Sequence, residues 1–196
     1  MLHKVKLTVI DKKLYPELQA QYCADPDSGV CPCYNVGDEF IFERYGTADD
    51  FWHMGLNTLK QTVNTADGVA GGTEFPHCSE AWDAISRYIY TGLQGGSIMR
   101  GWMNDERVMI ACCSDGTRPV IFKIERLDYK AVYMENLSDA DMRSALQSAF
   151  EKAEGVEHVA FREEYAEVYM NDDVPDATIR NMIEGCGECH ILKIDQ

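Results

Sequence analysis

Alternation of apolar and polar residues marks the first strands of the chain. Residues 5–10 read Val-Lys-Leu-Thr-Val-Ile and predict a strand, because a period of two places alternate side chains on one face. Residues 36–43 predict a turn followed by a strand with two Phe side chains on the same face. Segments 107–113 and 120–126 predict two further strands, joined by a turn that contains Asp-Gly. The first half of the chain is therefore expected to be rich in β-structure.

A helical period of hydrophobic positions is clearest at residues 79–93. Ser79 is the predicted N-cap, and a double glycine after the segment is the predicted stop. Weaker helical patterns cover 14–22 and 51–63, and a glycine-rich connection follows at 67–72. The main helix presents one apolar stripe, formed by Ala81, Trp82, Ile85, Tyr88, Ile89 and Leu93.

After residue 128 the pattern changes to a short alternation of strands and helices. The predicted order β-α-β-β-α-β is that of a ferredoxin-like module. We expect Ser138 to cap the first of its two helices, with acidic residues in the first turn. The expected strands are 131–134, 156–161, 165–170 and 190–194, and the expected helices are 139–153 and 176–183.

These patterns predict an α+β protein of two domains. Residues 1–128 form a small cysteine-bearing, β-rich domain with one main helix, and residues 129–196 form the ferredoxin-like βαββαβ module. Acidic residues outnumber basic ones more strongly in the second domain, which supports this boundary. Its helices are expected to cover one face of an antiparallel sheet and to bury Leu146, Phe150, Ile179 and Ile183.

Charge narrows the choice of partners. The 196 residues carry a formal net charge of −15. Such a chain repels phosphates and anionic headgroups, so nucleic acid and membrane surfaces are excluded as main partners. No stretch reaches the roughly 18 apolar residues of a membrane span, and the start of the chain lacks the features of a signal peptide. We therefore expect a cytoplasmic protein and leave assembly into a homo-oligomer open.

Cysteine is the most informative residue type, with eight copies. A chain of this length has room for a hydrophobic core without disulfides, so reduced thiols are expected. Metal ligation, redox chemistry and simple burial are then the available roles. The eight residues are Cys23, Cys31, Cys33, Cys78, Cys112, Cys113, Cys186 and Cys189.

Four of these cysteines are candidate ligands of one metal site in the first domain. Cys31 and Cys33 flank a proline, and residues two apart in extended backbone point to the same side. Cys78 precedes the main helix, whose N-terminal dipole stabilises a thiolate. Cys112 and Cys113 are adjacent in a strand and face opposite ways, and Cys113 is preferred because it adjoins the turn. Cys31, Cys33, Cys78 and Cys113 thus predict a tetrahedral four-thiolate site for zinc or iron, with burial in a β-rich core as the alternative.

The sequence Cys186-Gly-Glu-Cys189-His190 is a C-x-x-C-H motif, the attachment signature of a c-type haem. Haem attachment is disfavoured because no export signal is present. A thioredoxin-like role is disfavoured because the motif follows a helix C-terminus, where carbonyl dipoles oppose a thiolate. Two interpretations stay open. One is a metal knuckle in which Cys186, Cys189 and His190 bind zinc or iron with further ligands, and the other is a glycine-rich helix cap.

Other motifs indicate ordinary structure. Residues 115–118 are most simply a hairpin loop, with anion binding by Arg118 as the alternative. The glycine-rich segment 68–72 lacks the Lys-Ser/Thr ending of a phosphate-binding P-loop. No G-x-S-x-G, H-E-x-x-H or dinucleotide fingerprint is present in the sequence.

Several segments of residues 1–128 resemble one family of small proteins. The segment 46–75 reads as an insertion relative to that family, and Cys33 as an addition to its pattern. The segments that carry the resemblance are 4–10, the Cys31-Pro32 step before 36–40, the helix start at 78–85, and Ala-Cys-Cys-Ser-Asp-Gly-Thr-Arg-Pro-Val-Ile-Phe-Lys-Ile-Glu-Arg at 111–126. The family consists of cysteine-containing proteins of unknown function, found mainly in anaerobic bacteria and archaea. The resemblance implies a domain but no reaction.

Residues 129–196 are similar in pattern to heavy-metal-associated domains, which share the ferredoxin-like fold. Those domains bind metal through a Cys-x-x-Cys in the loop before the first helix. Here that loop, 134–139, contains no cysteine. The resemblance therefore implies the fold and not the metal-chaperone function.

Three functional hypotheses follow. The first is a non-catalytic, thiol-rich accessory protein that binds a metal or redox species in the cytoplasm of an anaerobe. The second is a cysteine-dependent enzyme that uses Cys78 as a nucleophile beside His77. The third is an interaction module without site chemistry.

Overall fold

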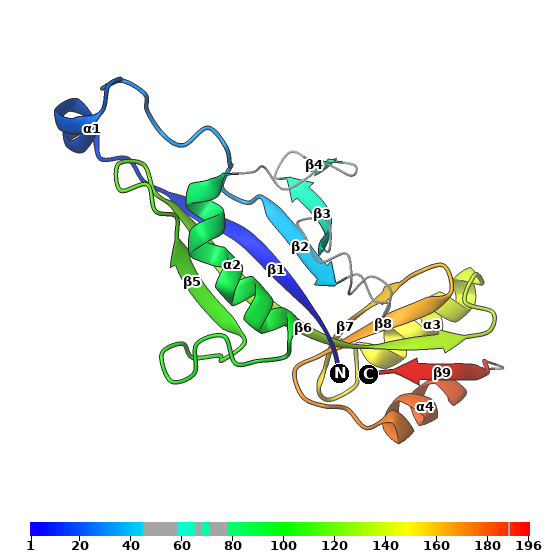
Figure 1. Cartoon of the computed structure of the whole chain (residues 1–196). Helices are drawn as coiled ribbons and strands as arrows, with labels where there is room; N and C mark the ends of the chain where they lie inside the picture. The colour runs from blue at the N-terminus through cyan, green and yellow to red at the C-terminus, as the bar shows by residue number, and fades with distance from the viewer. Residues whose placement is uncertain (45–58, 66–67, 71–77, 188) are drawn as a thin grey trace. The chain divides into compact units, whose positions relative to one another are not determined.

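The computed structural model describes residues 1–44, 59–65, 68–70, 78–187 and 189–196 (Figure 1). They form an α+β protein, as predicted. The chain divides into two compact units, one comprising Lys4–Arg126 and the other Met1–His3 together with Leu127–Gln196. This division lies beside the predicted boundary after residue 128.

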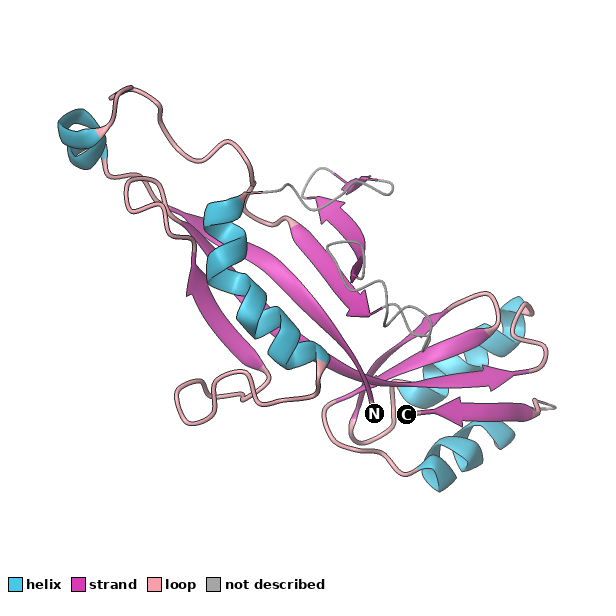
Figure 2. Cartoon of the chain, in the orientation of Figure 1, coloured by secondary structure: helices cyan, strands magenta, loops and turns pink. Residues whose placement is uncertain are grey.

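The unit Lys4–Arg126 is built on a layer of strands crossed by one long helix (Figure 2). Its strands follow the order β4-β3-β2-β1-β6, and β5 pairs with β6. Helix α2 packs against β5 and β2. The elements are β1 (Leu2–Lys12), α1 (Pro16–Tyr22), β2 (Glu39–Arg44), β3 (Leu59–Thr65), β4 (Gly68–Ala70), α2 (Ser79–Leu93), β5 (Val108–Cys112) and the first half of β6 (Val120–Met134).

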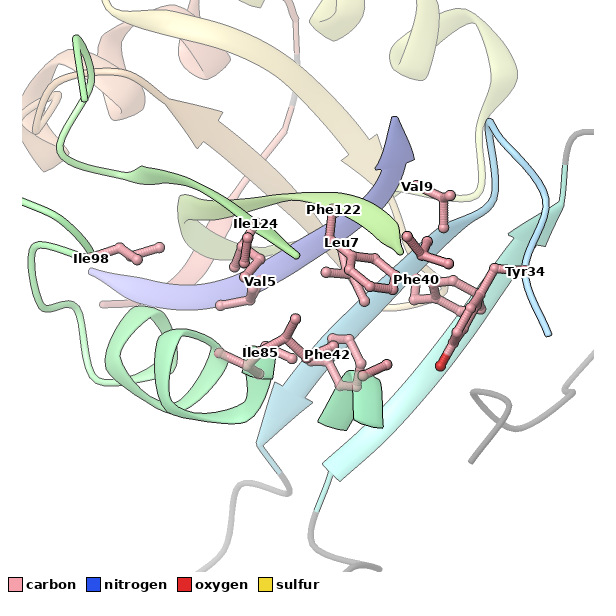
Figure 3. Close-up of a cluster of buried hydrophobic side chains, with 14 of the residues drawn as sticks. Val5, Leu7, Val9, Tyr34, Phe40, Phe42, Ile85, Ile98, Phe122 and Ile124 are labelled. Carbon is pink, nitrogen blue, oxygen red and sulfur yellow. The ribbon is translucent and has the colours of Figure 1, made fainter. Parts of the chain in front are cut away.

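The alternation seen in the sequence explains the core of this unit. In the antiparallel pair β1–β2, Leu7 lies opposite Phe40 and Val5 opposite Phe42. All four side chains are buried, and Ile85 of α2 is buried in the same cluster (Figure 3). Burying large apolar side chains in this way contributes roughly 1.5–3 kcal/mol each. The cluster therefore fixes α2 against the strands.

The unit that contains Leu127–Gln196 has the element order β-α-β-β-α-β on which the ferredoxin-like prediction rests. The strands pair antiparallel in the order β9-β6-β8-β7. The predicted core residues Leu146, Phe150, Ile179 and Ile183 are all fully buried. The elements are the second half of β6, α3 (Ala140–Phe150), β7 (Val156–Phe161), β8 (Tyr165–Met170), α4 (Asp176–Glu184) and β9 (Ile191–Asp195).

One predicted pair of strands is a single strand in the structure. β6 runs without interruption through residues 127–130, where the sequence pattern predicts a connection. Asp128 and Lys130 lie at buried positions, so the apolar alternation is broken there. Both charged groups have polar partners: Asp128 Oδ1 lies 2.7 Å from His3 Nδ1, and Lys130 Nζ lies 2.9 Å from Asp176 Oδ1. Such partners make burial at these positions tolerable.

The prediction of a helix at 51–63 is wrong for residues 59–63, the part of this segment that the structure describes. Residues 59–63 belong to strand β3, which pairs in register with β2, and residues 51–58 lie outside the described part of the chain. Strand β4 at 68–70 likewise occupies part of the predicted glycine-rich connection. Pairing with a neighbouring strand overrides local propensity in both segments.

Both predicted helix caps are shifted by one residue. The N-cap of α2 is Cys78 rather than Ser79. The N-cap of α3 is Asp139 rather than Ser138, and its carboxylate accepts hydrogen bonds from the amides of Asp141 and Met142 at 2.8 and 3.0 Å. A carboxylate also benefits from the helix dipole at this position.

Helix α3 ends at Phe150, earlier than the predicted residue 153. Within the described ranges, no helix has the length and apolar character of a membrane span.

Candidate functional site

Four cysteines of the unit Lys4–Arg126 line one cavity of about 180 Å³. They come from three stretches of sequence: the loop before β2, the start of α2 and the end of β5. These are the four residues that the sequence pattern groups as metal ligands. The cavity is lined by Cys31, Pro32, Cys33, Tyr34, Cys78, Glu80, Ala81, Cys113, Asp115, Arg118 and Val120.

The C-x-C segment is held in place by the residue that follows it. Tyr34 is 1% exposed, and its ring packs edge-on against Phe122 with the centroids 5.3 Å apart. The Tyr34 carbonyl accepts a hydrogen bond of 2.6 Å from Lys12 Nζ. Cys31 is buried and Cys33 is exposed, and both residues line the cavity. Both residues of the C-x-C segment thus line one site, although the backbone bends at residues 32–33 and is not extended as predicted.

Cys78 and Cys113 are brought together by a tether between α2 and the end of β5. The backbone amide of Ser114 donates to the Glu80 carbonyl at 3.2 Å, and its hydroxyl donates to the Glu80 carboxylate at 2.9 Å. Cys78 is the N-cap of α2, but its side chain does not cap the helix. The Cys113 sulfur accepts a hydrogen bond of 3.3 Å from the amide of Val120. Cys113 therefore lies one residue from the Ser114–Glu80 tether, and Cys78 lies two residues from it.

The end of β5 determines which of the adjacent residues Cys112 and Cys113 lines the cavity. Cys113 lines the cavity. Cys112 is exposed, and its thiol donates to the Cys113 carbonyl at 3.1 Å. Successive residues of a strand point to opposite sides, which separates the two sulfurs.

The surroundings of Cys33 oppose its ionisation. Burial raises the pKa of Cys33, and the neighbouring Cys31 and Cys78 raise it further, whereas Arg118 lowers it. Burial also raises the pKa of Tyr34, with added contributions from all four cavity thiols. A cation bound among these sulfurs would reverse the effect, because thiolates are the ligand form and their protons are released on binding.

One guanidinium stands at the edge of this cluster. Arg118 donates through Nε to the Asp115 carboxylate at 3.1 Å. Burial alone would raise the pKa of Asp115, but hydrogen bonds from Thr117 and Arg118 outweigh it and lower the pKa. The carboxylate therefore stays ionised and orients Arg118, whose pKa is raised chiefly by the same bond. The cavity thus combines four thiols with one guanidinium and the carboxylates of Glu80 and Asp115.

As the side chains stand in the described residues, no three His, Cys, Asp or Glu groups already surround a single point as metal ligands. Binding one ion would require the four thiols to turn toward a common centre. Such rotation about a side-chain bond is open to Cys33, which is exposed.

The C-x-x-C-H motif lies in the other unit. The Cys186 thiol donates to the Met182 carbonyl at 3.2 Å, and the Cys189 thiol donates to the Glu135 carbonyl at 3.4 Å. A carbonyl only accepts, so these contacts require the protonated thiol. Burial raises the pKa of Cys189.

The backbone around this motif has the form expected of a helix cap. Helix α4 ends at Glu184, Gly187 has a φ of +141°, and His190 is exposed. These observations favour the helix-cap interpretation over a metal knuckle.

Four polar lining residues are not assigned to the metal site by the sequence: Tyr34, Glu80, Asp115 and Arg118. Tyr34 directly follows the C-x-C segment, which is an available signal. Asp115 and Arg118 belong to a segment that reads most simply as a hairpin loop, and nothing local marks Glu80. His77, which the enzyme hypothesis places beside the nucleophile Cys78, lies outside the described residues.

Compared with known proteins, the chain matches no family model, no curated protein and no solved structure. The two family resemblances drawn from the sequence therefore stay predictions.

Proposed function

We propose that the unit Lys4–Arg126 binds a thiophilic metal species through Cys31, Cys33, Cys78 and Cys113, as a non-catalytic accessory protein. The observation that carries the proposal is that these four thiols, from three separate segments, line one cavity. Cysteines that only fill a hydrophobic core are not expected to line one open cavity together with an arginine and two carboxylates. Thiolate ligands select zinc, copper(I) and iron–sulfur species over hard cations.

Two features beside the cavity place positive charge near a metal–thiolate centre. A divalent ion with four thiolates carries a net charge of about −2, which needs compensation when partly buried. Arg118 supplies positive charge at the cavity, and Asp115 fixes its side chain. The start of α2 adds the positive end of a helix dipole beside Cys78.

The proposal includes a cytoplasmic location. All eight cysteines are free thiols, and free thiols persist in reducing compartments. The net charge of −15 supports a role that involves neither nucleic acid nor an anionic surface.

Metal analysis of anaerobically purified full-length protein tests the proposal. We expect zinc or iron in stoichiometric amounts in the wild type, and a loss of at least tenfold in Cys113→Ser. Cys112→Ser is the matched control, because it removes an adjacent thiol that does not line the cavity. The double variant Cys186→Ser/Cys189→Ser should also retain its metal. Circular dichroism and the unfolding midpoint show whether each variant is folded.

Two results would overturn the proposal. One is metal content that depends on Cys186 and Cys189 instead of the cavity thiols. The other is a metal-free wild type whose Cys78 is alkylated by iodoacetamide far faster than the other thiols, which would support the enzyme hypothesis.

A further inference from the structure

The cavity offers more room than one metal ion needs. Its volume of about 180 Å³ compares with about 30 Å³ for one water molecule in the liquid. A tetrahedral zinc ion draws four sulfurs to about 2.3 Å from one centre, so the sulfurs themselves enclose it. A polynuclear guest with its own bridging atoms fills such a space better.

The thiols are also arranged as two pairs. Cys31 and Cys33 lie on one short segment, on either side of Pro32, and both line the cavity. Cys78 and Cys113 lie on two elements that the Ser114–Glu80 bonds hold together. A pair of thiolates on each of two metals is the ligand arrangement of a [2Fe–2S] cluster.

We propose that the cavity holds a [2Fe–2S] cluster, with Cys31 and Cys33 on one iron and Cys78 and Cys113 on the other. This inference rests on the proposed function and names its metal species. Each thiol releases its proton as it binds iron, and the two bridging sulfides come from inorganic sulfide. The oxidised cluster with four thiolates carries a net charge of about −2, of which the neighbouring Arg118 offsets a part.

Anaerobic reconstitution of the full-length protein tests this assignment. The metal-free protein is incubated with ferric iron, inorganic sulfide and dithiothreitol and then desalted. We expect about two irons and about two acid-labile sulfides per chain, with visible sulfur-to-iron charge-transfer absorption. Reduction with dithionite should give an electron paramagnetic resonance signal of spin one-half. Cys112→Ser should incorporate the same amounts, whereas Cys31→Ser and Cys113→Ser should lose the signal or shift its g-values.

The failures of the two proposals are distinguishable. One zinc per chain at the same cysteines, with no sulfide incorporated under reconstitution, would overturn the cluster and leave the metal-binding proposal standing. Four irons and four sulfides per chain would overturn the pairwise assignment. A chain that takes up neither zinc nor iron with sulfide would remove both proposals.

Discussion

The hydroxyl of Ser114 donates a hydrogen bond of 2.9 Å to the carboxylate of Glu80. Ser114 directly follows Cys113, and Glu80 lies two residues after Cys78. The contact between these two polar side chains therefore links the segments that carry two candidate ligands. Because both residues are exposed, the bond matters more for local geometry than for global stability.

Ser114→Ala is therefore expected to weaken metal binding more than folding. The free energy of unfolding of the metal-free protein should fall by about 0.5–1 kcal/mol, the usual size of one hydrogen bond. Metal retention, measured by competition with a chelator, should fall by a clear factor because Cys113 loses its fixed position. Ser79→Ala, at an exposed neighbour on α2, is the control. Equal retention in both variants would show that the tether does not organise the site.

Gly92→Ala should destabilise the protein although alanine is the better helix former. The new Cβ would lie 2.6 Å from Cγ2 of Val5, a fully buried β-branched side chain that cannot easily move away. The overlap is expected to cost about 1–3 kcal/mol, against a gain of about 1 kcal/mol in helix propensity. Urea denaturation measures the difference.

Gly116→Ala is the matched control for that substitution, since a methyl group added at this position would meet nothing within 4 Å. Its unfolding midpoint should stay close to that of the wild type. A Gly92→Ala protein as stable as the wild type would mean that α2 approaches β1 less closely than the structure shows.

Asp139→Ala should lower the free energy of unfolding by about 1 kcal/mol, because two amides at the start of α3 lose their acceptor. Ser138→Ala should change it by less than about 0.5 kcal/mol, as is usual for an exposed position away from such contacts. Thermal or urea unfolding of the two variants distinguishes the caps. The reverse order of the two effects would restore Ser138 as the cap.

Alkylation of Cys189 should require strongly alkaline solution in the folded protein. Burial raises its pKa, so the rate of modification, followed by mass spectrometry, should reach its midpoint above pH 9.0. In urea the midpoint should drop to the ordinary thiol value. A raised pKa stabilises the fold below the unfolded-state pKa, and this contribution disappears as pH rises through the folded-state pKa. A midpoint below about pH 7 in metal-free protein would instead revive a redox role for the C-x-x-C-H motif.

Local periodicity was sufficient for several elements. The alternation in β1 places Val5 and Leu7 in the core, and the apolar stripe of α2 places Ile85 and Ile89 there. Period-two and period-3.6 patterns are properties of consecutive residues, so no long-range information is needed to read them. Their spacing brings Cys31 and Cys33 to the same cavity, but the backbone between them bends where the sequence predicts extension.

Only the tertiary structure decided which distant segments meet. The continuity of β6 depends on partners for Lys130 that lie more than 40 residues away, and the sequence pattern around it suggested a break. Likewise Cys78 and Cys113 share a cavity because α2 packs on β5, and Arg118 joins them because the following loop folds back. Charge pairing and interstrand contacts act between residues far apart in sequence, so the periodicity of consecutive residues cannot predict them.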